Sequence, residues 1–207
     1  MADVVVLGGG GHARVVVQLL GSLGHRPVGY AAPAPVPGAT ATWLGTDDEL
    51  LAGERTGTRV GAVGIGKTDA RDGRAVLLER YEAAGFRFPV LTAPSATVHE
   101  DVTFGSGTVV LSGAVVVTGS RLGRACIVNT HASVDHDCEL SDDVHVAPGA
   151  TLCGGVRVGA HTLIGAGATV LPGLAIADRC VVAAGATVTR SIDRPGVYAG
   201  TPARRIG

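Results

Sequence analysis

Large apolar side chains recur at every sixth position along the C-terminal half of the chain. The series runs without a gap through Val98, Phe104, Val110, Val116, Leu122, Val128, Val134, Leu140, Val146, Leu152, Val158, Ile164, Val170, Ile176, Val182 and Val188. An amphipathic helix repeats about every 3.6 residues and a half-buried strand about every 2, so neither explains this period. A coil of three short flat strands with a tight turn at each corner does explain it. The pattern therefore predicts a parallel β-helix shaped like a triangular prism.

The residues that follow each apolar position support this prediction. Four residues later stands a small or modest side chain, as at Val102, Thr108, Ala114, Cys126, Ala132, Cys138, Ala150 and Cys180. The next residue after the apolar one is often Gly or Ala, as at Gly105, Gly123, Gly159 and Gly165. We expect the first two sets to fill the prism, and the Gly or Ala to permit the corner turn. Stacked coils should pair as parallel strands about 4.8 Å apart.

The N-terminal part has a different pattern, of strand, glycine-rich turn, helix and strand. Val4 to Leu7 is an apolar run, four glycines follow it, and an apolar stretch to Leu23 precedes a second strand that ends at Tyr30. The turn contains a G-x-G-x-x-A pattern in the setting where such patterns bind phosphates. We therefore predict an α/β, Rossmann-like domain over residues 1–92, followed by a left-handed parallel β-helix of hexapeptide repeats over residues 93–207.

Two glycine turns are candidates for substrate binding. A helix N-terminus after a glycine turn favours a phosphate, and the second turn is followed by a basic residue. The candidate residues are Gly8, Gly10, Gly11, His12, Gly64, Gly66 and Lys67. A dinucleotide site would place an acidic residue after the second strand, where this chain has Ala31 and Ala32, so NAD is not expected. A phosphate-bearing ligand and a purely structural tight turn are the two alternatives.

Composition narrows the class of protein. Aromatic residues make up 3% of the chain and hydrophobic residues 46%, so the core must be aliphatic. The net charge of −1 gives no electrostatic footprint for nucleic acid. No apolar run reaches the roughly 20 residues of a membrane span, and the first residues lack the features of a signal peptide. Four cysteines without CxxC spacing favour free thiols, so we expect a cytoplasmic protein.

Further motifs narrow the class of enzyme. The segments that carry the resemblance are Gly8-Gly9-Gly10-Gly11-His12-Ala13, Gly64-Ile65-Gly66, Pro94-Ser95-Ala96, residues 129–138, residues 145–150 and Ala199-Gly200-Thr201-Pro202-Ala203. Together with the hexads they resemble the sugar O-acyltransferase group of the hexapeptide-repeat superfamily. That group includes sialic acid O-acetyltransferases and nucleotide-4-amino-sugar N-acetyltransferases. The resemblance implies a left-handed β-helix, a homotrimer, acetyl-CoA as co-substrate in grooves between subunits, and a nucleotide-linked amino sugar in the N-terminal domain.

Acetyl transfer needs a base, a group that stabilises the carbonyl oxygen, and a fixed pantetheine arm. Histidine is the usual base at neutral pH. His136 stands two residues after the inward Val134 and should lie on an outer face, where Asp137 or Asp135 would orient it. The resemblance assigns the base role to His136 with Asp137. It also suggests that His145, which we expect at a neighbouring corner, donates to the thioester carbonyl. Surface histidines without a role are the structural alternative.

Candidate residues for the pantetheine arm lie on the coils beyond His145. Small side chains there would leave room for the arm, and these are Gly154, Ala166 and Ala184. We predict N-acetylation of a nucleotide-linked 4-amino-4,6-dideoxy sugar, with O-acetylation of a sialic acid as the alternative.

Two further alternatives come from other classes of protein. A zinc hydratase of the γ-carbonic-anhydrase type would use the five-residue spacing of His131 and His136. Its third ligand should lie near position 95, where the chain has Ser95, so no metal is predicted. A non-catalytic nucleotide-binding protein is the last alternative, and the His136–Asp137 pair argues against it.

Overall fold

The N-terminal part of the chain is an α/β unit. A computed structural model describes residues 1–53 and 57–206. Four parallel strands form one sheet in the order β3-β2-β1-β4. They are β1 (Asp3–Leu7), β2 (Arg26–Ala31), β3 (Trp43–Gly45) and β4 (Gly61–Val63). The helices are α1 (Gly11–Ser22), α2 (Asp47–Ala52) and α3 (Gly73–Ala83). Val4 to Leu7 are fully buried, so β1 is the centre of this unit.

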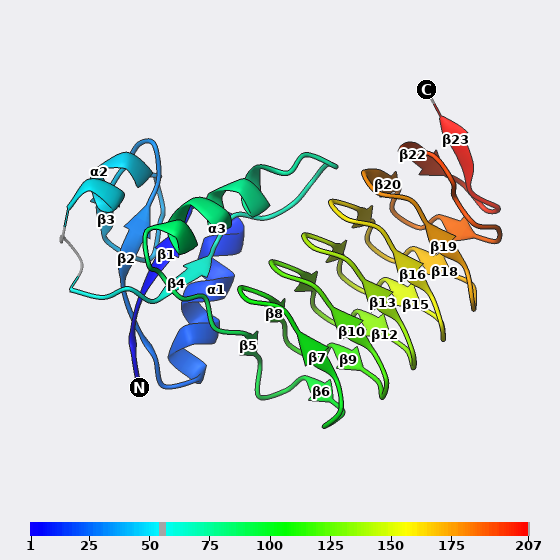
Figure 1. The fold of residues 1–207 in the computed structure, drawn as a ribbon, viewed down its shortest axis with the longest axis horizontal. Coiled ribbons are helices and arrows are strands. Elements are labelled where there is room, and N and C mark those ends of the chain that lie inside the picture. The colour runs from blue at the N-terminus through cyan, green and yellow to red at the C-terminus, as the bar shows by residue number, and fades with distance from the viewer. Residues whose placement is uncertain (54–56, 207) are drawn as a thin grey trace.

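The rest of the chain is a β-helix with three flat faces (Figure 1). The first face consists of β6 (Thr97–Val98), β9 (Val115–Val116), β12 (Ser133–Val134), β15 (Thr151–Leu152), β18 (Thr169–Val170) and β21 (Thr187–Val188). The second face consists of β7 (Thr103–Phe104), β10 (Arg121–Leu122), β13 (Glu139–Leu140), β16 (Arg157–Val158) and β19 (Ala175–Ile176). The third face consists of β5 (Leu91–Thr92), β8 (Val109–Val110), β11 (Ile127–Val128), β14 (His145–Val146), β17 (Leu163–Ile164), β20 (Cys180–Val182), β22 (Gly196–Ala199) and β23 (Arg204–Ile206).

The period of six is confirmed by the register of these strands. Each of the sixteen apolar positions is in a strand and pairs in parallel with the same position one coil away, as Val134 pairs with Val116 and Leu152. The second inward set is buried as well, except for the partly buried Val102 and Leu174, and Cys126, Cys138 and Cys180 are free thiols within the core. The prism is therefore filled by aliphatic and small side chains, as the composition requires.

The position of the corner turn corrects the sequence prediction. The backbone enters the left-handed region three residues after the inward apolar residue, and not at the next residue. Glycine occupies many of these positions, but Ala125, His131, Asp137, Asp143, His161 and Arg179 adopt the same positive φ. A positive φ is unfavourable for a side chain with a Cβ, although Asp and His tolerate it better than most residues. Corners without glycine were therefore invisible to a search for glycine.

The glycines next to the inward residues have another cause. A Cβ at Gly105 would lie 2.5 Å from the backbone N of Arg124, and one at Gly165 would lie 2.6 Å from the backbone N of Ala184. Both neighbours belong to the next coil, one turn along the chain. These positions are small because adjacent coils approach closely there, and not because the chain needs an unusual backbone angle.

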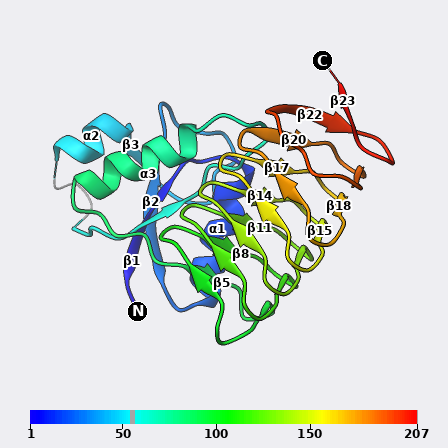
Figure 2. The same cartoon turned by 45° about the vertical axis from the view of Figure 1, so that its right-hand side comes forward.

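The N-terminal unit packs on the third face of the β-helix (Figures 1 and 2). The outward residues of that face form a shared core with the unit, in which helix α1 takes part through Val16 and Leu20. The outward residues concerned are Leu91, Val109 and Ile127. The pairing of the third face begins with β5, one strand before residue 93. The division into two domains stays a prediction.

None of the helices in the described part of the chain has the length and apolar character to cross a lipid bilayer.

Candidate functional site

A cavity of about 680 Å³ lies between the N-terminal unit and the third face of the β-helix. Its volume is in the range of small-molecule sites. All seven residues predicted to bind substrate line it, together with Leu111, Asn129 and His145 from the β-helix. The fold thus brings together two glycine turns that are about fifty residues apart in the sequence, at the point where the two parts of the chain meet.

The glycines of the cavity divide into two groups. A Cβ at Gly8 would lie 2.8 Å from the Ile65 side chain, so Gly8 allows the two turns to approach each other. A Cβ at Gly64 would lie 2.5 Å from the Val6 side chain, so Gly64 allows the second turn to pack against β1. Gly10 and Gly11 have open space where a Cβ would be. Gly10 is the N-cap of α1, and its first turn has no side-chain cap and no acidic residue. The first main-chain N–H groups of a helix have no partner within the helix, and at this end of α1 they favour the binding of an anion.

His145 lies in strand β14 and is 7% exposed, so it is not at a corner as the sequence predicted. It points outward from the prism, but the N-terminal unit covers it. Its Nδ1–H donates to the Lys67 carbonyl at 2.8 Å, and its Nε2 lies 3.0 Å from Asn129 Nδ2. Because the side-chain oxygen Oδ1 of Asn129 accepts from the Thr130 N–H, the side-chain amide nitrogen of Asn129 faces the ring. Burial lowers the pKa of His145 to about 4.

These contacts define the state of the His145 ring. The imidazole is neutral, carries its proton on Nδ1, and presents Nε2 as a hydrogen-bond acceptor. A donor role toward a thioester oxygen would require the other tautomer and the release of the Asn129 amide. The expected role of His145 as an oxyanion donor stays a prediction, and its geometry here is that of a cavity residue.

His12 begins helix α1 beside His145 and Arg74. Its Nε2 is buried and has no hydrogen-bond partner. Burial, with the nearby Arg74 and His145, lowers the pKa of His12 to about 3, so the ring is neutral. A buried polar atom without a partner is uncommon in a folded protein. His12 therefore lines the cavity as a neutral ring with one unpaired nitrogen beneath the surface.

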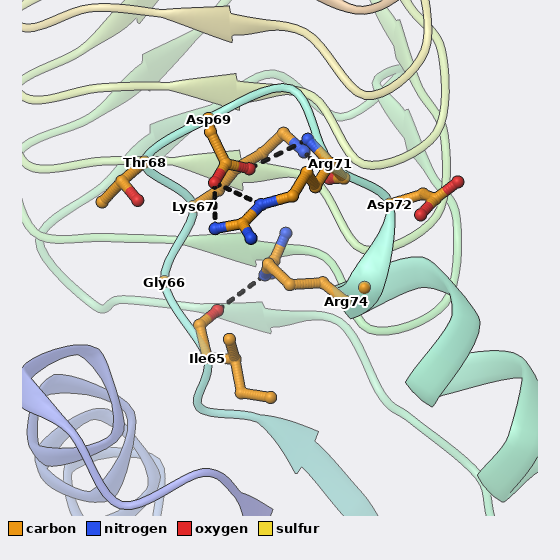
Figure 3. Close-up of a pocket in the computed structure, with 9 residues that line it drawn as sticks. Ile65, Gly66, Lys67, Thr68, Asp69, Arg71, Asp72 and Arg74 are labelled. Carbon is orange, nitrogen blue, oxygen red and sulfur yellow. Dashed lines mark hydrogen bonds and ion pairs between the residues drawn. The ribbon is translucent and has the colours of Figure 1, made fainter.

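Lys67 departs from its expected role. Its side chain is 2% exposed, and its ammonium group lies 2.7 Å from Asp143 Oδ2 and 2.7 Å from the Arg71 carbonyl, so it does not face the first glycine turn. Arg74 completes the cluster, with Nη1 2.6 Å from Asp143 Oδ1. Figure 3 shows the loop of residues 65–72 and the start of α3, which carry these side chains around a second cavity. No sequence pattern indicated this cluster, because Asp143 is 76 residues from Lys67 along the chain.

His136 and Asp137 lie at a corner between the first and second faces, as expected for an outer position. The His136 side chain is 56% exposed, and its Nδ1 lies 2.9 Å from Asp137 Oδ2. A carboxylate only accepts hydrogen bonds, so Nδ1 carries the proton and Nε2 is free to take another. The hydrogen bond to Asp137 and the nearby charge of Asp135 raise the pKa of His136. This arrangement is that of an oriented base.

The chain does not bring His136 to the cavity. In a triangular prism, the corner between the first and second faces lies opposite the third face, which carries His145. The three residues expected beside the pantetheine arm are also separated. Gly154 lies at the corner of His136, where the imidazole covers it, whereas Ala166 and Ala184 lie exposed at the corner between the third and first faces.

The zinc-hydratase alternative gains no support from this geometry. His131 follows the third face and His136 follows the first face, so the two histidines lie at different corners. Among the described residues, no group of three or more His, Cys, Asp and Glu side chains is arranged to hold a metal ion.

Comparison with known proteins shows the family. The model for the hexapeptide repeat of succinyl-transferase matches residues 155–190. The acetyltransferase domain of PglB from Neisseria gonorrhoeae is 34% identical, with 99% of both chains covered and a TM-score of 0.90. A variant of perosamine N-acetyltransferase from Caulobacter crescentus, in complex with CoA and GDP-perosamine, is 34% identical, with 99% of this chain and 97% of that chain covered and a TM-score of 0.93.

The chain belongs to the hexapeptide-repeat nucleotide-amino-sugar acetyltransferases. These matches indicate that the β-helix is left-handed, which the period of six alone did not decide. A curated relative in this family is GDP-perosamine N-acetyltransferase of Escherichia coli O157:H7, which is 29% identical over 50% of this chain and 45% of that protein. The matched region spans less than half the length of the curated relatives.

Proposed function

We propose that this chain transfers the acetyl group of acetyl-CoA to the amino group of a nucleotide-linked 4-amino-4,6-dideoxy sugar. The observation that carries the proposal is the exposed His136, which Asp137 orients at 2.9 Å with its second nitrogen free. Its support is the similarity, over nearly the whole chain, to an enzyme bound to CoA and GDP-perosamine.

His136 is the general base of the proposed reaction. Its Nε2 removes a proton from the sugar amine as the nitrogen attacks the thioester carbonyl carbon. The C–S bond then breaks, the amide forms, and the proton passes from His136 to the leaving thiolate of CoA. Asp137 holds the ring in the required tautomer and stabilises the imidazolium that forms, because its carboxylate lies against Nδ1.

The nucleotide sugar binds, in this proposal, in the cavity beside the N-terminal unit, which acts as a Rossmann-like domain over residues 1–92. The diphosphate lies over Gly10 and Gly11 at the N-terminus of α1, where there is open space. The neutral rings of His12 and His145 then face the ligand from two sides of the same cavity. Gly8, Gly64, Gly66 and Lys67 shape this cavity through their main chain.

The active site is completed by a second subunit in this proposal. His136 lies opposite the cavity of its own chain, so a nucleotide sugar bound in that cavity needs His136 from a neighbour. A homotrimer of the β-helix domain, residues 93–207, places one corner of each prism beside its neighbour. Acetyl-CoA then lies in the groove between subunits, with Gly154 contributed from one side, and Ala166 and Ala184 from the other. Mixing inactive variants that each retain one half of the site should restore activity.

The test is an acetyl-transfer assay with acetyl-CoA and two kinds of acceptor. Nucleotide-linked 4-amino-4,6-dideoxy sugars, including GDP- and UDP-linked forms, are supplied in one arm and free sialic acids in the other, and products are identified by mass. We expect an acetylated nucleotide sugar that resists mild base, as an amide does. Turnover of sialic acid alone, giving a base-labile ester, would overturn the proposal.

A further inference from the structure

The loop of residues 65–72, between β4 and α3, has a shape that its side chains determine. In the described chain, no hydrogen bond between main-chain groups joins residues 65–71 to another part of the protein. Instead, Arg74 Nε donates to the Ile65 carbonyl at 2.6 Å, and Lys67 Nζ donates to the Arg71 carbonyl at 2.7 Å. Figure 3 shows these side chains on the inner side of the loop. The two cations therefore define where the loop carbonyls point.

Asp143 binds both cations and attaches the loop to the β-helix. Its carboxylate is fully buried, with Lys67 Nζ 2.7 Å from Oδ2 and Arg74 Nη1 2.6 Å from Oδ1. His161 Nδ1 approaches Oδ2 at 3.2 Å. Buried charges carry a large desolvation cost, so they are weak devices for stability alone. The position also does not need Asp for the fold, because Ala125 occupies the equivalent corner one coil earlier.

The attached loop acts directly on the cavity. The carbonyl of Lys67 accepts the Nδ1–H of His145 at 2.8 Å, and this bond selects one tautomer of the ring. Asp143 precedes His145 by two residues, so a single short segment of the β-helix provides both the anchor for the loop and the ring that the loop orients. The connection runs from the Asp143 carboxylate, through Lys67, to the His145 imidazole.

We propose that Asp143 is a positioning residue for the nucleotide-sugar site: it fixes the 65–72 loop on the β-helix, and the Lys67 carbonyl of that loop fixes the tautomer of His145. The ring then accepts an N–H of the Asn129 amide at Nε2 and so holds that amide, which also lines the cavity, in one orientation toward the sugar. The assignment of the cavity to a nucleotide sugar rests on the proposed function, whereas the effect on the His145 ring does not.

The test uses Lys67→Met, which retains a side chain of similar length and leaves Asp143 paired with Arg74. Protein with ¹⁵N-labelled histidine is examined by two-dimensional NMR, which distinguishes the two tautomers, and His145 is assigned by its own substitution. We expect the Nδ1–H tautomer in the parent protein and a mixture with the Nε2–H tautomer in Lys67→Met. The nucleotide-sugar Kd should rise about tenfold, the scale of one lost hydrogen bond, with acetyl-CoA affinity unchanged. Asp143→Asn should likewise increase the Nε2–H tautomer of His145.

Arg179→Met is the matched control. Arg179 pairs with Asp72 at 2.8 Å and also joins the α3 region to the β-helix, but both side chains are partly exposed and neither contacts the Lys67 carbonyl. The substitution Arg179→Met should leave the His145 tautomer unchanged. A parent-like tautomer in Lys67→Met would overturn the proposal, and so would an equal change in Arg179→Met. Absence of acetyl transfer by the parent protein would count against the proposed function and leave the NMR result to decide this proposal.

Discussion

Gly154→Ala should displace the ring of His136, the proposed base, while leaving the fold intact. A Cβ at Gly154 would lie 2.6 Å from His136 Cε1 and 3.0 Å from Cδ2, whereas ordinary contacts begin at 3.4 Å. The imidazole must therefore retreat by about 1 Å, and misplacement of that size can reduce catalysis by roughly 10²-fold. Gly154 does not have a positive φ, and the atoms that it meets belong to an exposed side chain. The loss of stability should be about 0.5 kcal/mol or less.

The assay is a double-mutant cycle on kcat with saturating acetyl-CoA and nucleotide sugar. In the parent background, Gly154→Ala should reduce kcat by about 10- to 100-fold. In a His136→Ala background the clash is absent, so the same substitution should cause almost no further loss. An equal loss in both backgrounds would show that Gly154 acts through something other than His136. An unchanged kcat in the parent background would refute the placement of the ring over Gly154.

Three further predictions concern the pH profile, the glycine turn and assembly. Asp137→Asn removes the hydrogen bond that raises the pKa of His136. Because the base must be unprotonated, the acid limb of the kcat/KM profile should move to lower pH. An unmoved limb would show that His136 is not the titrating base. Gly10→Val should raise the nucleotide-sugar Kd and leave acetyl-CoA binding intact, because the added side chain would fill the open space beside the first glycine turn. Equal sugar binding by calorimetry would show that this turn is not part of the site. Light scattering should give a trimer at micromolar concentration, and a monomer would contradict the shared site.

The sequence predicted the β-helix well because one physical rule produces its pattern. The inward position of each strand must be apolar, so the series from Val98 to Val188 fixes the strands and their register. The corner position was wrong because a left-handed corner accepts Asp, His or Ala as well as Gly. The outward position before each inward residue held another signal. On the third face it is Val109, Ile127 and Leu163, whereas on the second face it is polar at Thr103, Arg121, Glu139 and Arg157. That contrast marks the face that the N-terminal unit covers.

The site was predictable where neighbours in sequence make it and not where distant segments meet. His136 and Asp137 are adjacent, so their hydrogen bond could be expected from the chain alone. The surroundings of His145 depend on a loop 78 residues away, so neither its burial nor its tautomer could be derived. The same distance concealed the pairing of Lys67 with Asp143, which turned an expected phosphate ligand into an internal ion pair.

The substitution His136→Ala tests whether His136 is the base for acetyl transfer. Both kcat and the affinity for acetyl-CoA are measured. We expect a loss of roughly 10²- to 10⁴-fold in kcat, because one positioned base contributes on that scale, with acetyl-CoA affinity almost unchanged. Thermal unfolding close to that of the parent protein would verify that the exposed substitution has not disturbed the β-helix. Near-normal turnover in His136→Ala would exclude His136 as the base.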